Sequence, residues 1–366
     1  MILENLSIIG YRNIAQADVC FCPKINSFVG LNGVGKTSLL DAIYYLSFCK
    51  SSLGVADSVL AGHESGGFML QGVYREPVAD NPLSTIVSAG YQLDKRKHFS
   101  FNKKEYSRYS DHIGVIPLVI SSPYDLELIS GNSAERRRFM DMVISQYDKE
   151  YLAQLIYYNR ALEQRNALLK SQSVSQDLFC AVECNMDSSA NVIFEKRRAF
   201  CEKLSPLFNG YYQAIGTDRE KVDIKYVSSL ENEPLQSLLE RNRQKDLILG
   251  YSTAGVHRDD IDMTLDGFPI RKEASQGQIK SYLTALRFAQ FKLLRSLCNT
   301  VPILLLDDLF DKLDERRVNN ILSLVAGDDF GQTFITDATP DRLGSMLEQR
   351  CNGIYKVFNV KNGVVQ

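Results

Sequence analysis

The feature that most constrains this chain is a glycine-rich loop near its start, which follows the pattern G-x-x-x-x-G-K-[ST]. Gly30, Gly35, Lys36 and Thr37 occupy the four fixed positions of this pattern. An apolar run at 25–29 precedes the loop, and apolar residues at helical spacing follow it. A strand, a loop and a helix are the context in which this pattern binds phosphate groups, so we favour nucleotide binding over a chance match in a glycine turn.

The loop predicts which groups contact the phosphates of the nucleotide and which bind Mg²⁺. Its successive N–H groups and the N-terminal end of the following helix would face the phosphates. The Lys36 ammonium can reach the β- and γ-phosphates, and the Thr37 hydroxyl can bind Mg²⁺. The loop residues expected to contact the nucleotide are Gly30, Leu31, Asn32, Gly33, Val34, Gly35, Lys36, Thr37 and Ser38.

Composition limits the class of protein. A chain of 366 residues should form about two domains. The net charge of −2 means that any contact with nucleic acid must come from a local basic face. Eight cysteines without paired C-x-x-C spacing and four histidines give little support to a zinc site. Because no apolar run reaches membrane-spanning length and no signal segment is visible, we expect a cytoplasmic protein without membrane contact.

A second motif lies near the other end of the chain. The apolar run at 303–306 ends in Asp307 and Asp308, which reads as a buried parallel strand with two carboxylates at its C-terminal tip. Ligands of open α/β sheets bind at that edge. In a P-loop protein, Asp307 would hold Mg²⁺ and Asp308 would orient or deprotonate the attacking water. We therefore expect Lys36 and Asp308 to act in catalysis, and regard a simple strand-end turn as the minor alternative.

A third motif precedes that strand. Ser275, Gln276, Gly277 and Gln278 introduce a long stretch with apolar residues at helical spacing. Ser275 and Gln278 have the spacing of a capping box, which predicts Ser275 as the N-cap. A glycine beside the cap makes the helix start a candidate anion site, and a plain capped helix is the alternative.

The middle of the chain has a sequence pattern typical of helices. Apolar residues recur at three- and four-residue steps from 132 to about 172 and again from 176 to 208, and loops and weak strands are expected to follow to 248. These patterns predict a helical arm at 125–250 between two flanking segments, 1–124 and 251–366.

Two basic stretches are candidates for contact with DNA. Lysines and arginines between Lys95 and Arg108 alternate with aromatic residues, although a solvated hairpin face explains such a pattern equally simply. Arg136, Arg137 and Arg138 lie at a helix start, against the helix dipole, which indicates either a phosphate or carboxylate partner or a solvated face.

The order of the motifs resembles that of an ABC-type ATPase. The large separation between the P-loop and the Ser275 motif resembles the SMC/Rad50 branch, here with a short helical insertion. Further segments are similar to the RecF family of bacterial recombination mediators. They are Tyr11-Arg12-Asn13, the run from Ser133 to Asp141, Tyr157 to Leu162, Gln164 to Leu169, Gly255 to Asp260, and Leu304 to Asp308.

The resemblance implies a fold and a function. It implies an α/β P-loop ATPase lobe of the ABC type, formed by both chain ends, with an inserted, mainly helical second lobe. It also implies a weak, DNA-stimulated ATPase of DNA replication and recombinational gap repair. Such a protein forms an ATP-dependent homodimer on double-stranded DNA and single/double-strand junctions, and with RecO and RecR promotes RecA loading. An SMC-like nucleotide switch that dimerises on DNA with little hydrolysis is the alternative.

The resemblance also assigns residues. Arg12 would contact the nucleotide, and Ser275, Gln276, Gly277 and Gln278 would cap the γ-phosphate held by the other subunit. Thr336 or Asp337 would take the switch position. Asp308 stands where the wider class has glutamate, so slow turnover is expected, and no glutamine near Pro123 supplies the Q-loop contact.

Overall fold

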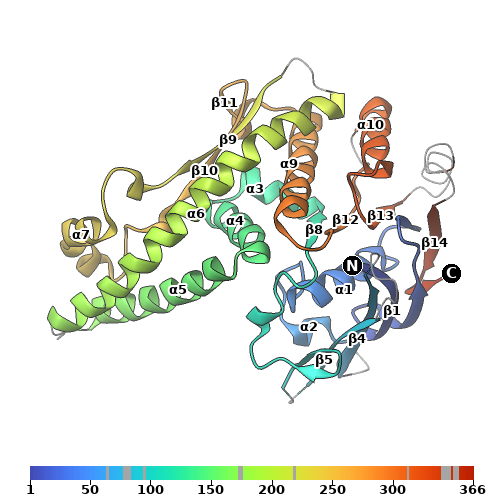
Figure 1. Cartoon of the computed structure of the whole chain (residues 1–366), viewed down its shortest axis with the longest axis horizontal. Coiled ribbons are helices and arrows are strands. Elements are labelled where there is room, and N and C mark those ends of the chain that lie inside the picture. Colours follow the sequence, from blue (N-terminus) through green and yellow to red (C-terminus); the bar gives the residue numbers. More distant parts are fainter. Residues whose placement is uncertain are drawn as a thin grey trace. The chain divides into compact units, whose positions relative to one another are not determined.

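The computed structural model divides the chain into two compact units. Unit 1 contains Met1–Asp125 and Gln276–Gln366, together with the end of helix α6 (Gln176–Gly216), and unit 2 contains the rest of the chain. Both chain ends therefore build one unit (Figure 1). The structure describes residues 1–62, 66–76, 84–93, 96–171, 176–216, 220–310, 313–338, 348 and 354–366.

A mainly parallel sheet forms the core of unit 1. It brings together strands from the two ends of the chain, and β3, β13, β12 and β8 run parallel, so their carboxyl ends share one edge. Its buried strands are short apolar runs, as parallel strands covered on both faces require. In spatial order its strands are β15 (Val364–Val365), β14 (Tyr355–Lys361), β3 (Ile25–Val29), β13 (Thr333–Asp337), β12 (Ile303–Leu306) and β8 (Leu118–Ser121).

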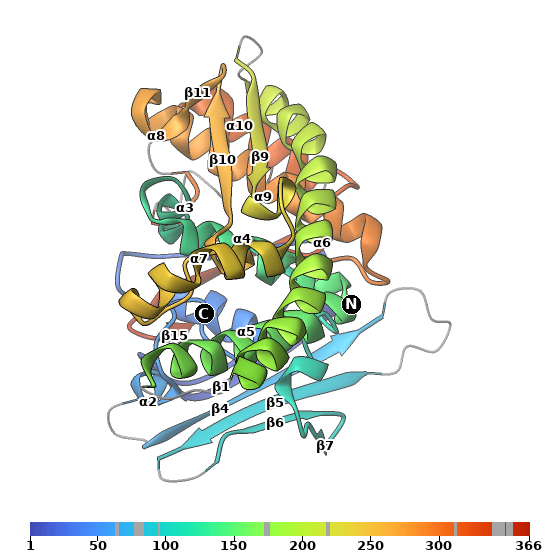
Figure 2. The ribbon, with the colours of Figure 1, turned by 90° about the vertical axis from the view of Figure 1, so that its left-hand side faces the viewer.

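A second sheet in unit 1 is antiparallel, and its β1, β4 and β5 lie side by side in Figure 2. Helix α1 (Lys36–Phe48) contacts strands of both sheets, and every residue of α1 except Thr37 is buried. The P-loop helix is thus fixed on two faces. In spatial order the strands are β2 (Ile14–Cys20), β1 (Ile2–Tyr11), β4 (Gly67–Arg75), β5 (Thr85–Gln92), β6 (His98–Phe101) and β7 (Lys104–Glu105).

The other α-helices described in unit 1 do not all pack on the same sheet, since α2 contacts β4 and β5 of the antiparallel sheet. Helix α9 contacts β8, and its buried face includes Tyr282, Leu286 and Phe291. Asp314 caps helix α10 by accepting a hydrogen bond from the Arg317 N–H. Besides α1, these helices are α2 (Asp57–Leu60), α9 (Gln276–Leu297) and α10 (Glu315–Ala326).

Unit 2 combines helices with a small sheet, and Figure 2 shows β9 and β10 beside α6. Buried ion pairs join its elements, because Arg165 reaches Glu183 and Asp246 while Arg197 reaches Asp141 and Asp259. Its elements, besides α6, are α3 (Leu126–Ser130), α4 (Ser133–Tyr147), α5 (Lys149–Lys170), β9 (Val222–Val227), α7 (Leu235–Leu249), β10 (Asp260–Leu265), β11 (Phe268–Pro269) and α8 (Ile270–Glu273).

Three expectations for this region need correction. Unit 2 extends to Ser275 rather than to residue 250, because β10 pairs with β9 and ties the segment after 250 to the helices. The helix expected from 132 to 172 is broken at Asp148, whose side chain caps α5 by accepting from the Tyr151 N–H. Helix α7 occupies a stretch expected to be loop and weak strand.

None of the helices in the described part of the chain combines the length and the apolar character that a membrane-spanning segment needs.

Candidate nucleotide-binding site

The P-loop joins β3 to α1 at the carboxyl edge of the parallel sheet. Gly30 has φ +151°, and a Cβ there would lie 2.3 Å from the carbonyl oxygen of Val360 in neighbouring β14. Gly35 has φ +117° at the N-cap of α1. Both positions need glycine, one because β14 comes so close and the other because of its backbone torsion. The sequence pattern therefore reflects backbone geometry that a side chain would prevent.

Lys36 lies inside this loop. Its side chain is buried, and its Nζ donates hydrogen bonds to the carbonyl oxygens of Gly30 (2.6 Å) and Leu31 (2.8 Å). Burial lowers the pKa of Lys36, while the carboxylates of Asp308 and Asp307 oppose that shift. The ammonium group is thus held at the centre of the loop, next to acidic groups.

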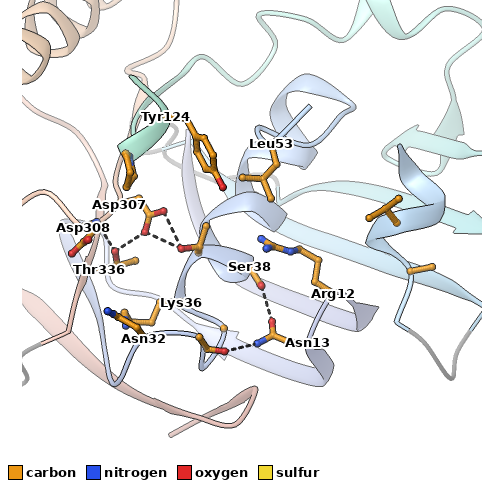
Figure 3. Close-up of a pocket in the computed structure, with 16 residues that line it drawn as sticks. Arg12, Asn13, Asn32, Lys36, Ser38, Leu53, Tyr124, Asp307, Asp308 and Thr336 are labelled. Atoms are coloured by element: carbon orange, nitrogen blue, oxygen red, sulfur yellow. Dashed lines mark hydrogen bonds between the residues drawn. The ribbon is translucent and has the colours of Figure 1, made fainter. Parts of the chain in front are cut away.

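Asp307 forms the centre of a hydroxyl–carboxylate cluster (Figure 3). Thr37 Oγ1 lies 3.0 Å from Asp307 Oδ2, and Thr336 Oγ1 donates to Asp307 Oδ1 at 2.7 Å. Burial raises the pKa of Asp307, and the hydrogen bonds from Thr336 and Thr37 oppose that rise. Parallel pairing explains the cluster, because Leu306 pairs with Ile335 and so places Asp307 next to Thr336. A carboxylate beside a hydroxyl is a ligand set suited to Mg²⁺.

Asp308 has an unusual backbone. Its φ is +49°, in the left-handed region that residues other than glycine seldom occupy. Its N–H donates to Thr336 Oγ1 at 2.9 Å, and its carbonyl oxygen accepts from Lys280 Nζ at 2.8 Å. The residue lines the same pocket as Lys36 and Thr37. Two side chains from other elements therefore fix the peptide groups on either side of this acid.

Arg12 lies on the hairpin turn between β1 and β2. It too has a left-handed backbone, with φ +55°. It lines the pocket, and among the described residues its buried NH1 has no hydrogen-bond partner. A strained backbone and an unpaired buried donor are both costly, which is typical of a residue set up to bind a ligand.

Asn13 was not assigned a role from the sequence. Its side-chain amide donates to the Gly33 carbonyl at 3.2 Å and accepts from Ser38 Oγ at 2.7 Å. Asn13 therefore links the hairpin to the middle of the P-loop and to the first turn of α1 (Figure 3). Its place directly after Arg12, in a turn upstream of the loop, was the only signal available.

The pocket around these groups has a volume of about 690 Å³. Its remaining wall was not predicted, because it comes from segments without a recognised motif. Tyr124, which is 59% exposed, lies on the wall opposite Asn13, three residues after the end of β8 (Figure 3). The wall residues that sequence reasoning missed are Leu53, Val59, Ala61, Pro123 and Tyr124.

The Ser275 motif lies elsewhere. Helix α9 begins at Gln276, directly after Ser275, and a Cβ on Gly277 would lie 3.1 Å from Arg317 NH1. Within the part of the chain that the structure describes, Gln276, Gly277 and Gln278 are not among the residues lining the pocket. The structure thus joins Arg12, most of the P-loop, Asp307, Asp308 and Thr336. The start of α9 does not line the pocket, and neither do the predicted P-loop residues Gly30, Leu31 and Val34. The capping role of Ser275 stays a prediction.

The arginine triplet of α4 is largely satisfied within unit 2. Arg136 forms a bidentate pair with Asp260, with distances of 2.6 and 3.0 Å. Arg137 donates to the Asp259 carbonyl at 2.7 Å. Arg138 remains 45% exposed, with Glu135 at 3.9 Å. Arg136 therefore has a carboxylate of its own unit as its partner, and Arg137 has a backbone carbonyl.

The other basic stretch keeps an exposed face. Lys95 lies outside the described residues, and Lys97 is used internally, since it pairs with Asp57 at 3.1 Å. The aromatic residues of this stretch pack into the protein, with Phe99 fully buried. The cations that remain exposed are Arg96, Lys103, Lys104 and Arg108.

Comparison with known proteins resolves the family. The chain is 50% identical over 366 residues to the DNA replication and repair protein RecF of Bacteroides thetaiotaomicron, covering 100% of this chain and 98% of that protein. The corresponding RecF of Phocaeicola vulgatus is 51% identical over 367 residues, with the same coverage. This chain belongs to the RecF family. The resemblance seen in the sequence is confirmed, and RecF membership gives the protein a role in DNA repair.

Structural similarity agrees with the RecF assignment. A solved structure of the recombination mediator protein RecF with ATP, described as part of the RecFOR pathway, has a TM-score of 0.88 and 28% identity, covering 100% of this chain and 97% of that one. Residues 1–248 match an AAA ATPase domain. An Smc head domain from Pyrococcus furiosus, at 14% identity and a TM-score of 0.58, shares the fold. The predicted α/β P-loop ATPase fold, with its mainly helical insertion, is confirmed.

Proposed function

We propose that this RecF-family ATPase forms an ATP-dependent homodimer that clamps on duplex DNA. With RecO and RecR, this dimer promotes RecA loading at single-strand gaps. The observation that carries the proposal is the incomplete pocket. Lys36, Asp307 and Asp308 meet in one pocket, but the start of α9, whose sequence resembles the signature of ABC-type ATPases, does not line it. A second copy would supply that part.

The pocket suits a nucleoside triphosphate with a divalent cation. The N–H groups of the P-loop and Lys36 would bind the phosphates, and the unpaired NH1 of Arg12 would donate to the nucleotide. Thr37 and Asp307 would hold Mg²⁺, which neutralises charge on the β- and γ-phosphates when bound. Thr336 would keep Asp307 oriented. Tyr124 lines the pocket next to Pro123, the segment in which no glutamine was found for the Q-loop contact.

Asp308 would act as the general base. It lines the pocket one residue after the cation-binding Asp307, so its carboxylate can accept a proton from a water that attacks the γ-phosphate. The side chain is one methylene shorter than the glutamate of the wider ABC class, so it reaches that water less closely. We therefore infer slow hydrolysis that DNA stimulates, with conversion to ADP and phosphate reopening the dimer.

The DNA-binding face would lie on the edge of the antiparallel sheet. Arg136 and Arg137 are engaged within unit 2, whereas Arg96, Lys103, Lys104 and Arg108 remain exposed around β6 and β7. Exposed lysines and arginines contact the phosphate backbone without reading sequence. Similarity to the RecF of the RecFOR pathway supports RecR and RecO as partners. Single/double-strand junctions are the proposed place of action.

A complementation experiment tests the shared site. Lys36→Met should abolish hydrolysis by removing the phosphate contact, and Ser275→Arg should abolish it by blocking the signature. In a mixed dimer of the two variants, one composite site contains both defects and the other contains neither. We therefore expect an equimolar mixture to hydrolyse ATP faster than either variant alone, and at no more than half of the wild-type rate, because each mixed dimer has one intact site. A mixture as inactive as its components would refute a site shared between subunits.

A further inference from the structure

Helix α9 contacts Asp308, the proposed general base, directly. Lys280 lies in the second turn of this helix, and its Nζ donates to the carbonyl oxygen of Asp308 at 2.8 Å. The first turn of the same helix carries Gly277 and Gln278. One rigid element therefore joins the signature motif at its start to the proposed general base of the chain's own site.

The Asp308 backbone needs such support. A left-handed backbone at a residue other than glycine is strained, and it persists only where the surroundings fix it. Here Thr336 Oγ1 holds the N–H and Lys280 Nζ holds the carbonyl. Loss of either contact would let the peptide rotate toward ordinary torsions and move the carboxylate. The Lys280 contact involves a charged donor, which makes it the stronger kind of hydrogen bond.

Helix α9 is also anchored further along. Arg287 is buried and forms a bidentate pair with Asp125, with distances of 2.6 and 3.0 Å. Asp125 directly follows Tyr124, which lines the pocket. The helix thus contacts two pocket segments, one after β8 and one after β12. A small movement of its first turn would reach Asp308 through Lys280 while Arg287 keeps the rest of the helix in place.

We propose that Lys280 is a positioning residue that couples the two ATP sites of the dimer. When the first turn of α9 engages the γ-phosphate bound by the partner subunit, Lys280 fixes Asp308 for hydrolysis in its own subunit. This inference rests on the proposed function, because the coupling needs the ATP-bound dimer. The contact between Lys280 and Asp308 lies within one chain and can be tested by itself.

The test compares Lys280→Met with Lys292→Met, the same substitution three turns later in α9, where the lysine pairs at the surface with Asp329. A general base contributes roughly 10²–10⁴-fold to a rate, so its misplacement should lower kcat by about tenfold or more. The KM for ATP and ATP-dependent dimerisation should stay within about twofold of wild type. Lys280→Arg, which keeps a cationic donor, should restore most of kcat, and Lys292→Met should behave as wild type.

Coupling has its own readout. Wild-type hydrolysis should rise cooperatively with ATP concentration, and Lys280→Met should lose that cooperativity while it still dimerises. Unchanged kcat in Lys280→Met, or an equal loss in Lys292→Met, would overturn the inference and leave the shared site intact. If Lys280→Met fails to fold, Lys280→Gln carries the same prediction. A wild-type chain that stays monomeric with ATP would refute the proposed function and, with it, the coupling.

Discussion

Thr336 offers the sharpest test of how the site is built. Its hydroxyl accepts from the Asp308 N–H at 2.9 Å and donates to Asp307 Oδ1 at 2.7 Å, and the residue is 1% exposed. Thr336→Val keeps the shape of the side chain and replaces the hydroxyl by a methyl group. The substitution therefore leaves the Asp308 N–H without this acceptor, removes one of the two hydroxyls that contact the Asp307 carboxylate, and creates no cavity.

The cost follows from these contacts. An orphaned buried N–H costs about 1–3 kcal/mol, and the lost bond to a carboxylate about 1.5–3 kcal/mol. Asp308 also faces the open pocket, where water can replace part of what is lost, so the lower half of the sum applies. We expect Thr336→Val to lower the free energy of unfolding by about 3 kcal/mol. It should also raise the pKa of Asp307 further, because the Thr336 bond lowers that pKa.

Urea denaturation followed by circular dichroism measures this free energy, and Mg²⁺-dependent ATP binding across pH measures the effect on Asp307. Thr336→Ser is the matched control, since it keeps the hydroxyl and loses one methyl group. The pH at which ATP binding falls by half should be higher in Thr336→Val than in Thr336→Ser, because Mg²⁺ needs the ionised carboxylate. Equal unfolding free energies for the two variants, within about 0.5 kcal/mol, would refute this reading of the cluster.

Three further predictions concern the base, the fold and the DNA face. Asp308→Asn should retain ATP-dependent dimerisation and lose hydrolysis by about 10²-fold or more, whereas unchanged hydrolysis would favour the nucleotide-switch alternative. Burial lowers the pKa of His257 to about 4, and its ring lies between the Tyr158 hydroxyl and a backbone carbonyl. As the pH falls, the imidazole of His257 takes up a proton in the unfolded chain before it does so in the folded chain, so the free energy of unfolding should fall by about 2 kcal/mol from pH 7 to pH 5. His257→Gln should remove that part of the pH dependence. An unchanged dependence of the free energy of unfolding on pH in this variant would contradict the assignment. Replacing Lys103 and Lys104 by Gln should weaken duplex binding and reduce the slope of log K against log salt by about 2, while an unaltered slope would place the DNA elsewhere.

The sequence predicts the parts of the site that local backbone rules control. The P-loop needs Gly35 for a backbone torsion within the loop itself, although Gly30 is needed because distant β14 comes close, and the Asp307 strand is a short apolar run with acids at its tip. Parallel pairing then brings Thr336 beside Asp307 without further information. These elements are predictable because motif, strand and sheet edge all depend on the same short segments.

The remaining parts depend on contacts between distant segments. The extension of unit 2 to Ser275 requires β10 to pair with β9, and Asp148 breaks a periodic helix with a single side-chain cap. Charged residues in α7 obscure its apolar spacing. The bond from Lys280 to the Asp308 carbonyl follows from the packing of α9 against the sheet, which no local pattern records.

The most direct test of the account is sedimentation velocity of the purified chain with and without ATP, Mg²⁺ and duplex DNA, beside Lys36→Met. The account predicts a monomer without nucleotide and a dimer with ATP and Mg²⁺ that binds duplex DNA. The Lys36→Met chain should remain monomeric in every condition, because the P-loop no longer holds the phosphates. A wild-type chain that stays monomeric with ATP and DNA, or that dimerises equally well without nucleotide, would contradict the ATP-driven clamp.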